Sequence, residues 1–235
     1  MKHRLSLAVA LLAAVALPAL AGDALNTLTD AEQKAGWKLL WDGKTLNGWH
    51  AFKKTEAPKQ GWEIHDGVLK CVAGGKGGDI ISEKTYDDFE LSWEWSMPEK
   101  SNNGVKYFIT EERSSAIGHE YQMIDDSLVK DHAESSTASF YLVVAPDPAK
   151  KHVKPFGEWN HSRILVQGNH VEHWLNGGKV VEYECGDPKI LELVQKTKFK
   201  GVEGFGTKIR GHILLTYHND ECNFRNIKLR ELPAK

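Results

Sequence analysis

The sequence lacks the features that place a chain in several large protein classes. It has three cysteines in 235 residues and no Cys-x-x-Cys pair, which argues against a cysteine zinc site and allows at most one disulfide. Its 30 basic residues nearly balance its 32 acidic ones and form no basic patch, so nucleic acid is not an expected partner. The P-loop, the GxSxG elbow, the HExxH motif and a dinucleotide-binding glycine motif are also absent.

Only one long apolar run is present, and it lies at the start of the chain. Lys2 and Arg4 precede the apolar stretch 5–20, and Ala19-Leu20-Ala21 matches a small-x-small cleavage site. A run of roughly 16 apolar residues is short for a membrane anchor, so we interpret residues 1–21 as a signal peptide. We expect export to the periplasm or the medium, no membrane contact after removal of the signal, a flexible arm at 22–28 and one domain at 29–235.

The rest of the chain has mainly the period of β-strands. Short helices are expected at 30–35, where Thr29 and Glu32 form a capping box, and from Asp187-Pro188 to about 198. Strands separated by glycine-containing turns are expected at 37–41, 62–65, 68–72, 89–97, 105–109, 120–124, 139–144, 159–166, 170–175, 180–183, 212–217 and 223–229. The predicted fold class is all-β, a two-sheet antiparallel β-sandwich or jelly roll with one or two short helices.

Two strands carry the strongest patterns. In 89–97 the odd positions are apolar and the even positions polar, which predicts one buried and one wet face. In 120–124 Glu120 and Gln122 share one face, whereas His119, Tyr121 and Asp125 point to the other. The face with a carboxylate beside an amide is either a plain solvated surface or the floor of a cleft. A conventional glycosidase uses two carboxylates, so the amide of Gln122 weakens that assignment.

Seven short motifs follow one another in the order found in one protein family. They are Trp41-Asp-Gly-Lys-Thr-Leu-Asn-Gly-Trp49, Asp88-Phe-Glu-Leu91, Ser101-Asn-Asn-Gly104, Gly118-His-Glu-Tyr-Gln-Met-Ile-Asp125, Glu158-Trp-Asn160, Trp174-Leu-Asn-Gly177 and Phe224-Arg-Asn-Ile227. On these motifs the chain resembles the 3-keto-disaccharide hydrolase family over about 29–231. The resemblance implies a concanavalin A-like jelly roll, export and cleavage of 3-keto-glycosides. The chain departs from the family pattern at Asn103, at 106–108 and at Thr216.

The chemistry of such a reaction selects three candidate catalytic residues. A 3-keto group acidifies the hydrogen at C2, so a base, an acid or proton relay, and donors to the enolate oxygen are sufficient for cleavage. Glu120, His218 and Gln122 are the residue types required, and His218 titrates in the right range. Each has an ordinary alternative: a solvated carboxylate, a histidine in a surface turn and a cross-strand amide.

Candidate substrate-binding residues come from the other motifs. They are Asn103, Asp125, Trp159, Asn160 and Arg225. Alternatives are a turn at Asn103-Gly104, a structural turn at Asp125 and a salt bridge from Arg225.

Cofactors and partners are less defined than the sugar chemistry. No cofactor follows from the sequence, but a divalent cation held by His119, Glu120 and His218 would polarise the ketone. An oligosaccharide or glycoside is the expected partner. A conventional glycoside hydrolase and a non-catalytic carbohydrate-binding module remain as alternative functions.

Overall fold

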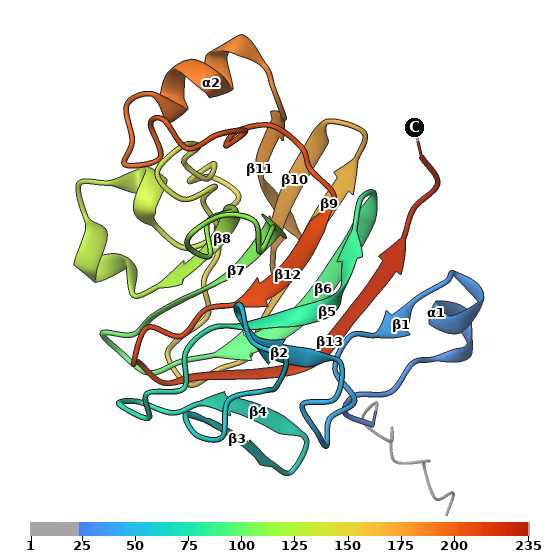
Figure 1. The fold of residues 1–235 in the computed structure, drawn as a ribbon. Helices are drawn as coiled ribbons and strands as arrows, with labels where there is room; N and C mark the ends of the chain where they lie inside the picture. The colour runs from blue at the N-terminus through green and yellow to red at the C-terminus, as the bar shows by residue number, and fades with distance from the viewer. Residues whose placement is uncertain (1–23, 235) are drawn as a thin grey trace, which may run out of the picture.

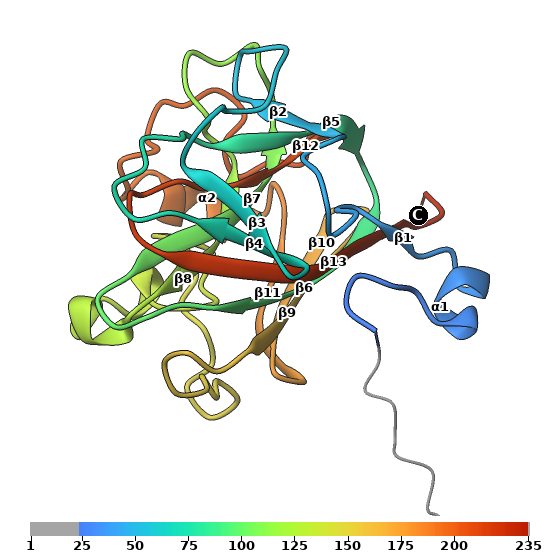
Figure 2. The same ribbon diagram turned by 90° about the horizontal axis from the view of Figure 1, so that it is seen from below.

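Two antiparallel sheets make up the fold, as the sequence predicts. The computed structural model describes residues 24–234, so the predicted signal peptide at 1–21 lies outside the described residues. Figures 1 and 2 show the two sheets as facing layers joined by loops. No helix within 24–234 is long and apolar enough to cross a membrane.

The large sheet has eight strands and the small sheet has five. The large sheet runs β11 (Gly178–Glu184), β10 (His170–Leu175), β9 (Asn160–Gln167), β6 (Phe89–Ser96), β13 (Cys222–Glu231), β4 (Val68–Cys71) and β3 (Trp62–His65), and β1 (Lys38–Leu39) also pairs with β13. The small sheet runs β2 (Trp49–Ala51), β5 (Ile80–Tyr86), β12 (Gly211–Leu215), β7 (Asn102–Ile109) and β8 (His119–Ile124). Two 3₁₀ turns, η1 (Asp126–Val129) and η2 (Ala133–Ser135), follow β8.

Both predicted helices are present. In α1 (Asp30–Lys34) the Thr29 hydroxyl accepts the Glu32 N–H, which confirms the capping box. In α2 (Pro188–Val194) the Asp187 carboxylate accepts the Lys189 N–H. This helix ends before the predicted 198, because the backbone folds into turns from Val194 onward. Figure 1 shows α2 next to the end of β11, which precedes it in the chain, and far from α1.

The core lies between the sheets and is rich in aromatic rings. Trp93 and Trp95 from β6 are 1% exposed, as predicted for the apolar face of that strand. The prediction that the opposite face of this strand is exposed to solvent is wrong, because Glu90, Ser92 and Ser96 are also buried. β6 is an interior strand of the large sheet, and long side chains of its neighbours β9 and β13 cover its outer face.

Several local predictions differ from the structure. Residues 139–144 form turns and two isolated bridges rather than a strand, because Ala138 and Leu142 have φ near +69° and +65°. Asn103-Gly104 lies inside β7 rather than in a turn. Strands β2 and β5 had no counterpart in the prediction. In the predicted flexible arm, Asn26 is buried and exchanges two hydrogen bonds with Asn226. All three cysteines are buried free thiols.

Candidate active site

One pocket on the outer face of the small sheet brings together Glu120, Gln122 and His218. Its volume is about 440 Å³, within the range of small-molecule sites. Its floor comes from β7 and β8, and its walls come from the loop before β8, from Tyr141 and from the segment after α2. Hollows of about 410 and 320 Å³ lie elsewhere on the molecule. The chemistry of its lining, rather than its size, distinguishes the small-sheet pocket.

Strand alternation places the carboxylate beside the amide. In the β7–β8 register Lys106 lies opposite Glu120, and Gly104 lies opposite Gln122. A Cβ atom on Gly104 would come within 2.4 Å of Glu120 Oε1, so the glycine leaves the space that this carboxyl group occupies. Every residue of β8 is buried because loops cover its outer face. This is therefore the floor of a cleft and not an open surface.

Glu120 is a buried carboxyl group with no cation within hydrogen-bonding distance to balance its charge. It is 6% exposed, and its nearest cation is Lys106, whose Nζ lies 3.9 Å from Oε2. Burial raises the pKa of Glu120; Lys106 and Lys198 oppose this shift, and Asp79 adds to it. The protonated acid is favoured over a wider pH range than for an ordinary glutamate.

His218 follows β12 and lies at the exposed edge of the same pocket. Partial removal of the ring from water lowers the pKa of His218, and the Lys106 charge lowers it further, while Asp79 and Asp220 oppose the shift. A neutral imidazole is therefore favoured. Opposite pKa shifts in one pocket define a pair of groups suited to be proton acceptor and proton donor.

Hydrogen-bond donors complete the pocket. The Gln122 Oε1 accepts the Met123 N–H at 3.3 Å, which leaves the amide NH₂ as its donor group. The Lys106 ammonium lies on the same side of the sheet and is 3.5 Å from the Ala116 carbonyl oxygen. These donors could stabilise negative charge that develops on a bound oxygen.

Asn103 lies beside Gly104 on β7 but does not line the pocket, and Asp125, which follows β8, lines the separate hollow of about 320 Å³. Asn103 is 0% exposed, and its Oδ1 accepts the Thr216 hydroxyl at 3.2 Å and the Gly104 N–H. Full burial leaves it no surface for a sugar hydroxyl. Asp125 caps η1 by accepting the Ser127 N–H and also accepts the Lys100 N–H, both at 2.9 Å. The structural alternative for Asp125 is the one that the structure shows.

The other predicted binding residues, Arg225 and Asn160, lie on the large sheet, and Trp159 directly precedes its strand β9. The Arg225 guanidinium is 2.6 Å from Glu94 and stacks 4.0 Å above the Trp159 ring. Asn160 is 2% exposed, and its Oδ1 accepts from the Lys154 backbone and the Asn176 amide. The structure does not bring these three residues to the pocket, and the salt-bridge alternative for Arg225 is correct.

His119 points into the core, away from Glu120. Its Nε2 accepts the Gly206 N–H at 3.1 Å, and its Nδ1 lies 2.7 Å from the Tyr183 hydroxyl oxygen. Burial first, and then the charges of His173 and Arg113, lower the pKa of His119 to about 3. Both ring nitrogens are occupied by protein groups, so the predicted cation site of His119, Glu120 and His218 is wrong.

Several pocket residues were missed from the sequence. Lys106 and Asn102 share the face of Gly104 on β7, so the period of that strand carries a signal for them once its partner is known. Tyr141, Lys198 and Phe199 come from segments without regular structure. No periodic signal exists for such residues.

Comparisons with known proteins agree with the fold and with the sequence motifs. A family model described as the 3-keto-alpha-glucoside-1,2-lyase-like domain matches residues 36–230. A 3-keto-disaccharide hydrolase of Bacteroides thetaiotaomicron is 31% identical over 245 aligned positions, which cover 89% of this chain and 82% of the relative.

Solved structures extend the comparison. The crystal structure of a candidate glycosyl hydrolase from Parabacteroides distasonis has a TM-score of 0.79 and 29% identity, and covers 88% of this chain and 99% of its own. A second such protein from the same organism has a TM-score of 0.63 and 25% identity, and covers 83% and 99%. Because the family model matches most of its length, the chain belongs to the family of the 3-keto-alpha-glucoside-1,2-lyase-like domain.

Proposed function

We propose that this chain is an enzyme that cleaves 3-keto-glycosides and begins by removing the proton at C2 of the oxidised sugar. One observation carries the proposal: in a single pocket the pKa of Glu120 is raised and the pKa of His218 is lowered. A protonated carboxyl group and a neutral imidazole are the acid and the base that this reaction needs. The description of the family and the name of the B. thetaiotaomicron relative support the substrate class.

The proposed first step is an elimination. The His218 imidazole removes the C2 proton, and the electron pair moves to the oxygen at C3 to form an enolate. The Lys106 ammonium and the Gln122 amide stabilise that oxygen. As the enolate collapses, the bond between C1 and the glycosidic oxygen breaks, a C1=C2 double bond forms, and Glu120 donates its proton to the leaving oxygen.

Addition of water would convert this elimination into hydrolysis. Water adds at C1 and a proton returns to C2, so the sum is cleavage of the glycosidic bond by one water molecule. A reaction that stops before this step is that of a lyase, and one that completes it is that of a hydrolase. The two steps account for both words in the names of the relatives.

A substrate comparison tests the proposal. Purified protein is offered trehalose and 3-keto-trehalose, and released glucose is measured. Cleavage of the oxidised sugar alone supports the proposal. Cleavage of both sugars supports a conventional glycoside hydrolase, for which Asp79 is the second carboxylate in the pocket. Binding without turnover supports a carbohydrate-binding module.

Isotope exchange tests the mechanism. In deuterated water the C2 hydrogen of the oxidised sugar should exchange during turnover, and His218→Asn should lower exchange and turnover together by about 100-fold. His65→Ala is the control, since His65 is exposed and, within residues 24–234, its ring forms an ion pair with Glu63 alone. Turnover without any C2 exchange would contradict the elimination. Export stays a prediction, because the segment that carries it lies outside the described residues.

A further inference from the structure

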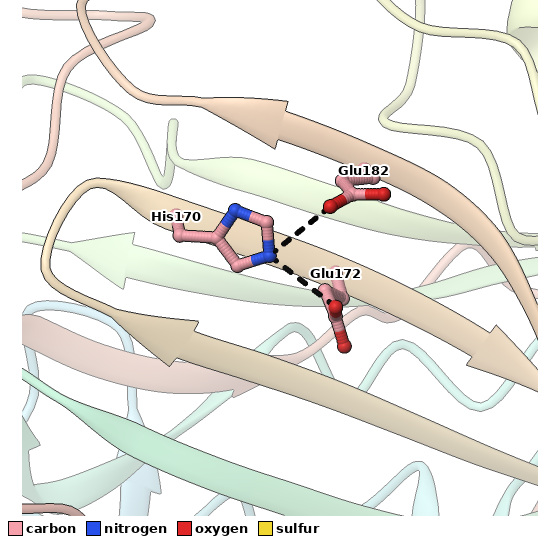
Figure 3. Close-up of side chains that lie close together, drawn as sticks. All are labelled: His170, Glu172 and Glu182. Carbon is pink, nitrogen blue, oxygen red and sulfur yellow. Dashed lines mark hydrogen bonds and ion pairs between the residues drawn. The ribbon is translucent and has the colours of Figure 1, made fainter.

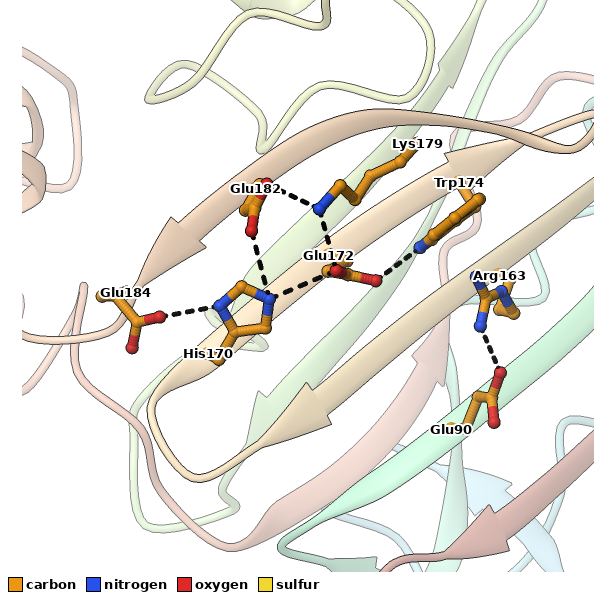
Figure 4. Close-up of polar contacts among 8 residues, drawn as sticks. All are labelled: Glu90, Arg163, His170, Glu172, Trp174, Lys179, Glu182 and Glu184. Carbon is orange, nitrogen blue, oxygen red and sulfur yellow. Dashed lines mark hydrogen bonds and ion pairs between the residues drawn. The ribbon is translucent and has the colours of Figure 1, made fainter. Parts of the chain in front are cut away.

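A second cluster of titratable groups lies on the other sheet, at the β11 edge. His170 and Glu172 from β10 and Glu182 and Glu184 from β11 share its outer face (Figure 3; Figure 4). In the register His170 lies opposite Glu184, and Glu172 lies opposite Glu182. The four side chains therefore form a two-by-two block, and none of them lines the Glu120 pocket.

The block contains more negative charge than its neighbours balance. Two carboxylates directly opposite each other on paired strands repel. One ammonium group, Lys179 Nζ, lies between them, 3.1 Å from Glu172 and 2.6 Å from Glu182 (Figure 4). Three carboxylates against one ammonium leave two negative charges when the His170 ring is neutral.

Hydrogen bonding orients the histidine toward the two carboxylates. His170 Nδ1 lies 2.7 Å from Glu184 Oε1, and because a carboxylate only accepts, Nδ1 carries the hydrogen. The lone pair of the neutral ring is then on Nε2, which lies 3.3 Å from Glu172 Oε1 and 3.5 Å from Glu182 Oε1. Three acceptor atoms within 4.8 Å of one another face a common point. Their negative charge favours a cation between them, and in this structure the nearest one is the Lys179 ammonium.

We propose that His170 Nε2, Glu172 Oε1 and Glu182 Oε1 bind a divalent cation, Zn²⁺ by their chemistry. Ligands about 2.0–2.1 Å from a tetrahedral Zn²⁺ lie about 3.3–3.4 Å apart, which matches the two separations from Nε2. An imidazole with two carboxylates suits Zn²⁺, whereas Mg²⁺ and Ca²⁺ favour all-oxygen sites. Three protein ligands leave the fourth position to water.

The surroundings of the ligands fit this assignment. A carboxylate that holds the second nitrogen of a metal-binding histidine is a common supporting contact, and Glu184 supplies it. The Trp174 indole donates to Glu172 Oε2 at 2.7 Å, so on Oε1 the metal replaces Lys179 Nζ, which lies 3.1 Å from that atom. The cation takes the position between the carboxylates, and Lys179, on the edge strand, turns outward. The bound ion joins β11 to β10 and stabilises the free edge of the large sheet.

The test is titration of the metal-stripped full chain with Zn²⁺ alone, followed by calorimetry and thermal unfolding. The parent should bind one equivalent and gain melting temperature, and His170→Ala should lose both effects. His65→Ala is the matched control and should retain them, since His65 has a single carboxylate partner. Mg²⁺ at the same concentration should have no effect.

Lys179→Met separates a metal site from a simple ion-pair network. Removal of an ammonium that competes with the metal should tighten Zn²⁺ binding at least about tenfold. A network held by Lys179 alone would instead lose stability and bind no zinc. No saturable binding by the parent, equal binding by His170→Ala, or unchanged affinity in Lys179→Met would each overturn the proposal.

Discussion

The outer face of each sheet contains a buried glutamate, but the two glutamates differ in their hydrogen-bonding partners. Glu90 on the large sheet is 4% exposed and accepts from Arg163 at 2.5 Å and from Arg230 at 2.7 and 2.6 Å. Glu120 on the small sheet is 6% exposed, and among the described residues no group lies within hydrogen-bonding distance of its carboxyl oxygens. Burial alone therefore does not single out a candidate functional carboxylate. Burial without a hydrogen-bonding partner makes Glu120 the better candidate of the two.

Strand position explains the difference. Glu90 lies on β6, an interior strand, and receives its guanidinium partners from the strands on both sides (Figure 4 shows Arg163). Glu120 lies on β8, the last strand of the small sheet, so only β7 offers it a cross-strand neighbour. Loops cover the other side and contribute backbone, aromatic rings and Lys198. A carboxyl group such as that of Glu120 can thus be buried without a hydrogen-bonding partner when it lies on an edge strand covered by loops.

The same substitution on both faces gives the sharpest contrast. Glu120→Gln should lower kcat/KM by about 100- to 10,000-fold, as loss of a general acid does, with little change in stability. Glu90→Gln should leave kcat of the folded enzyme unchanged and lower the free energy of unfolding by about 3 kcal/mol, because a buried ion-pair network loses its charge. Steady-state kinetics on the 3-keto substrate and urea unfolding measure the two effects. Equal effects of the two variants on activity would refute the comparison.

Gly104→Ala tests how closely the Glu120 carboxyl group must be placed. The added methyl would meet Oε1 at 2.4 Å and displace it. Since small displacements of catalytic groups are costly, kcat should fall by about 10- to 100-fold. The folded fraction, followed by circular dichroism, should stay near that of the parent. Parental kcat would mean that the position of Glu120 does not matter.

Lys106→Met tests the charge shared by the acid and the base. The rate should fall on the acid side as His218 gains a proton below pH 6.5, and on the alkaline side as Glu120 loses its proton above pH 4.5. Because Lys106 lowers the pKa of both groups, both limbs of the kcat/KM profile should move to higher pH. Lys179→Met on the large sheet is the control and should leave both limbs in place.

The stability of the core should depend on pH in the opposite sense from that of the large-sheet face. Burial lowers the pKa of His173 to about 4 and that of His119 to about 3, so each contributes stability above pH 6.5 that is lost as the pH falls. The unfolding free energy should fall by up to about 1.4 kcal/mol per pH unit for each residue. Urea unfolding between pH 7 and 4 measures this slope, and His173→Gln should reduce it.

His170, on the outer face of the large sheet, should show the opposite dependence of stability on pH. Burial opposes charging of its ring, but the hydrogen bonds that the ring donates to Glu184 and Glu172 prevail and raise the pKa of His170 above 6.5. Its contribution is therefore complete below pH 6.5 and is lost as the pH rises through the raised pKa. His170→Ala should lower stability more at pH 6 than at pH 9. The reverse order would contradict the geometry of the block.

Much of the fold could be predicted from periodicity, and the failures have physical causes. The strand at 62–65 and the capping box at Thr29 follow from local pattern and appear as expected. β5 was missed because Ser82-Glu-Lys-Thr85 interrupts its apolar residues after a glycine-rich stretch. Residues 139–144 look like a strand but contain left-handed backbone that no side-chain period reveals.

The site was predictable only in part. Parity within β8 correctly separated Glu120 and Gln122 from His119. Family motifs did not distinguish pocket residues from supports, so Asn103, Asn160 and Arg225 were selected although they hold the framework. Lys198 and Tyr141 reach the pocket through tertiary packing of irregular segments, which the sequence does not encode in any regular spacing.

The bond from Gly206 to His119 has a consequence for evolution of the enzyme. This hydrogen bond holds the segment that carries Lys198 and Phe199 against the core. The ring centroids of Phe199 and Phe205 are 4.2 Å apart, and the two rings stack. The wall that a sugar would touch is thus shaped by an imidazole that no sugar reaches. An interior mutation at His119 would therefore move this wall, so surveys of variants with altered substrate preference should include interior positions as well as the cavity mouth.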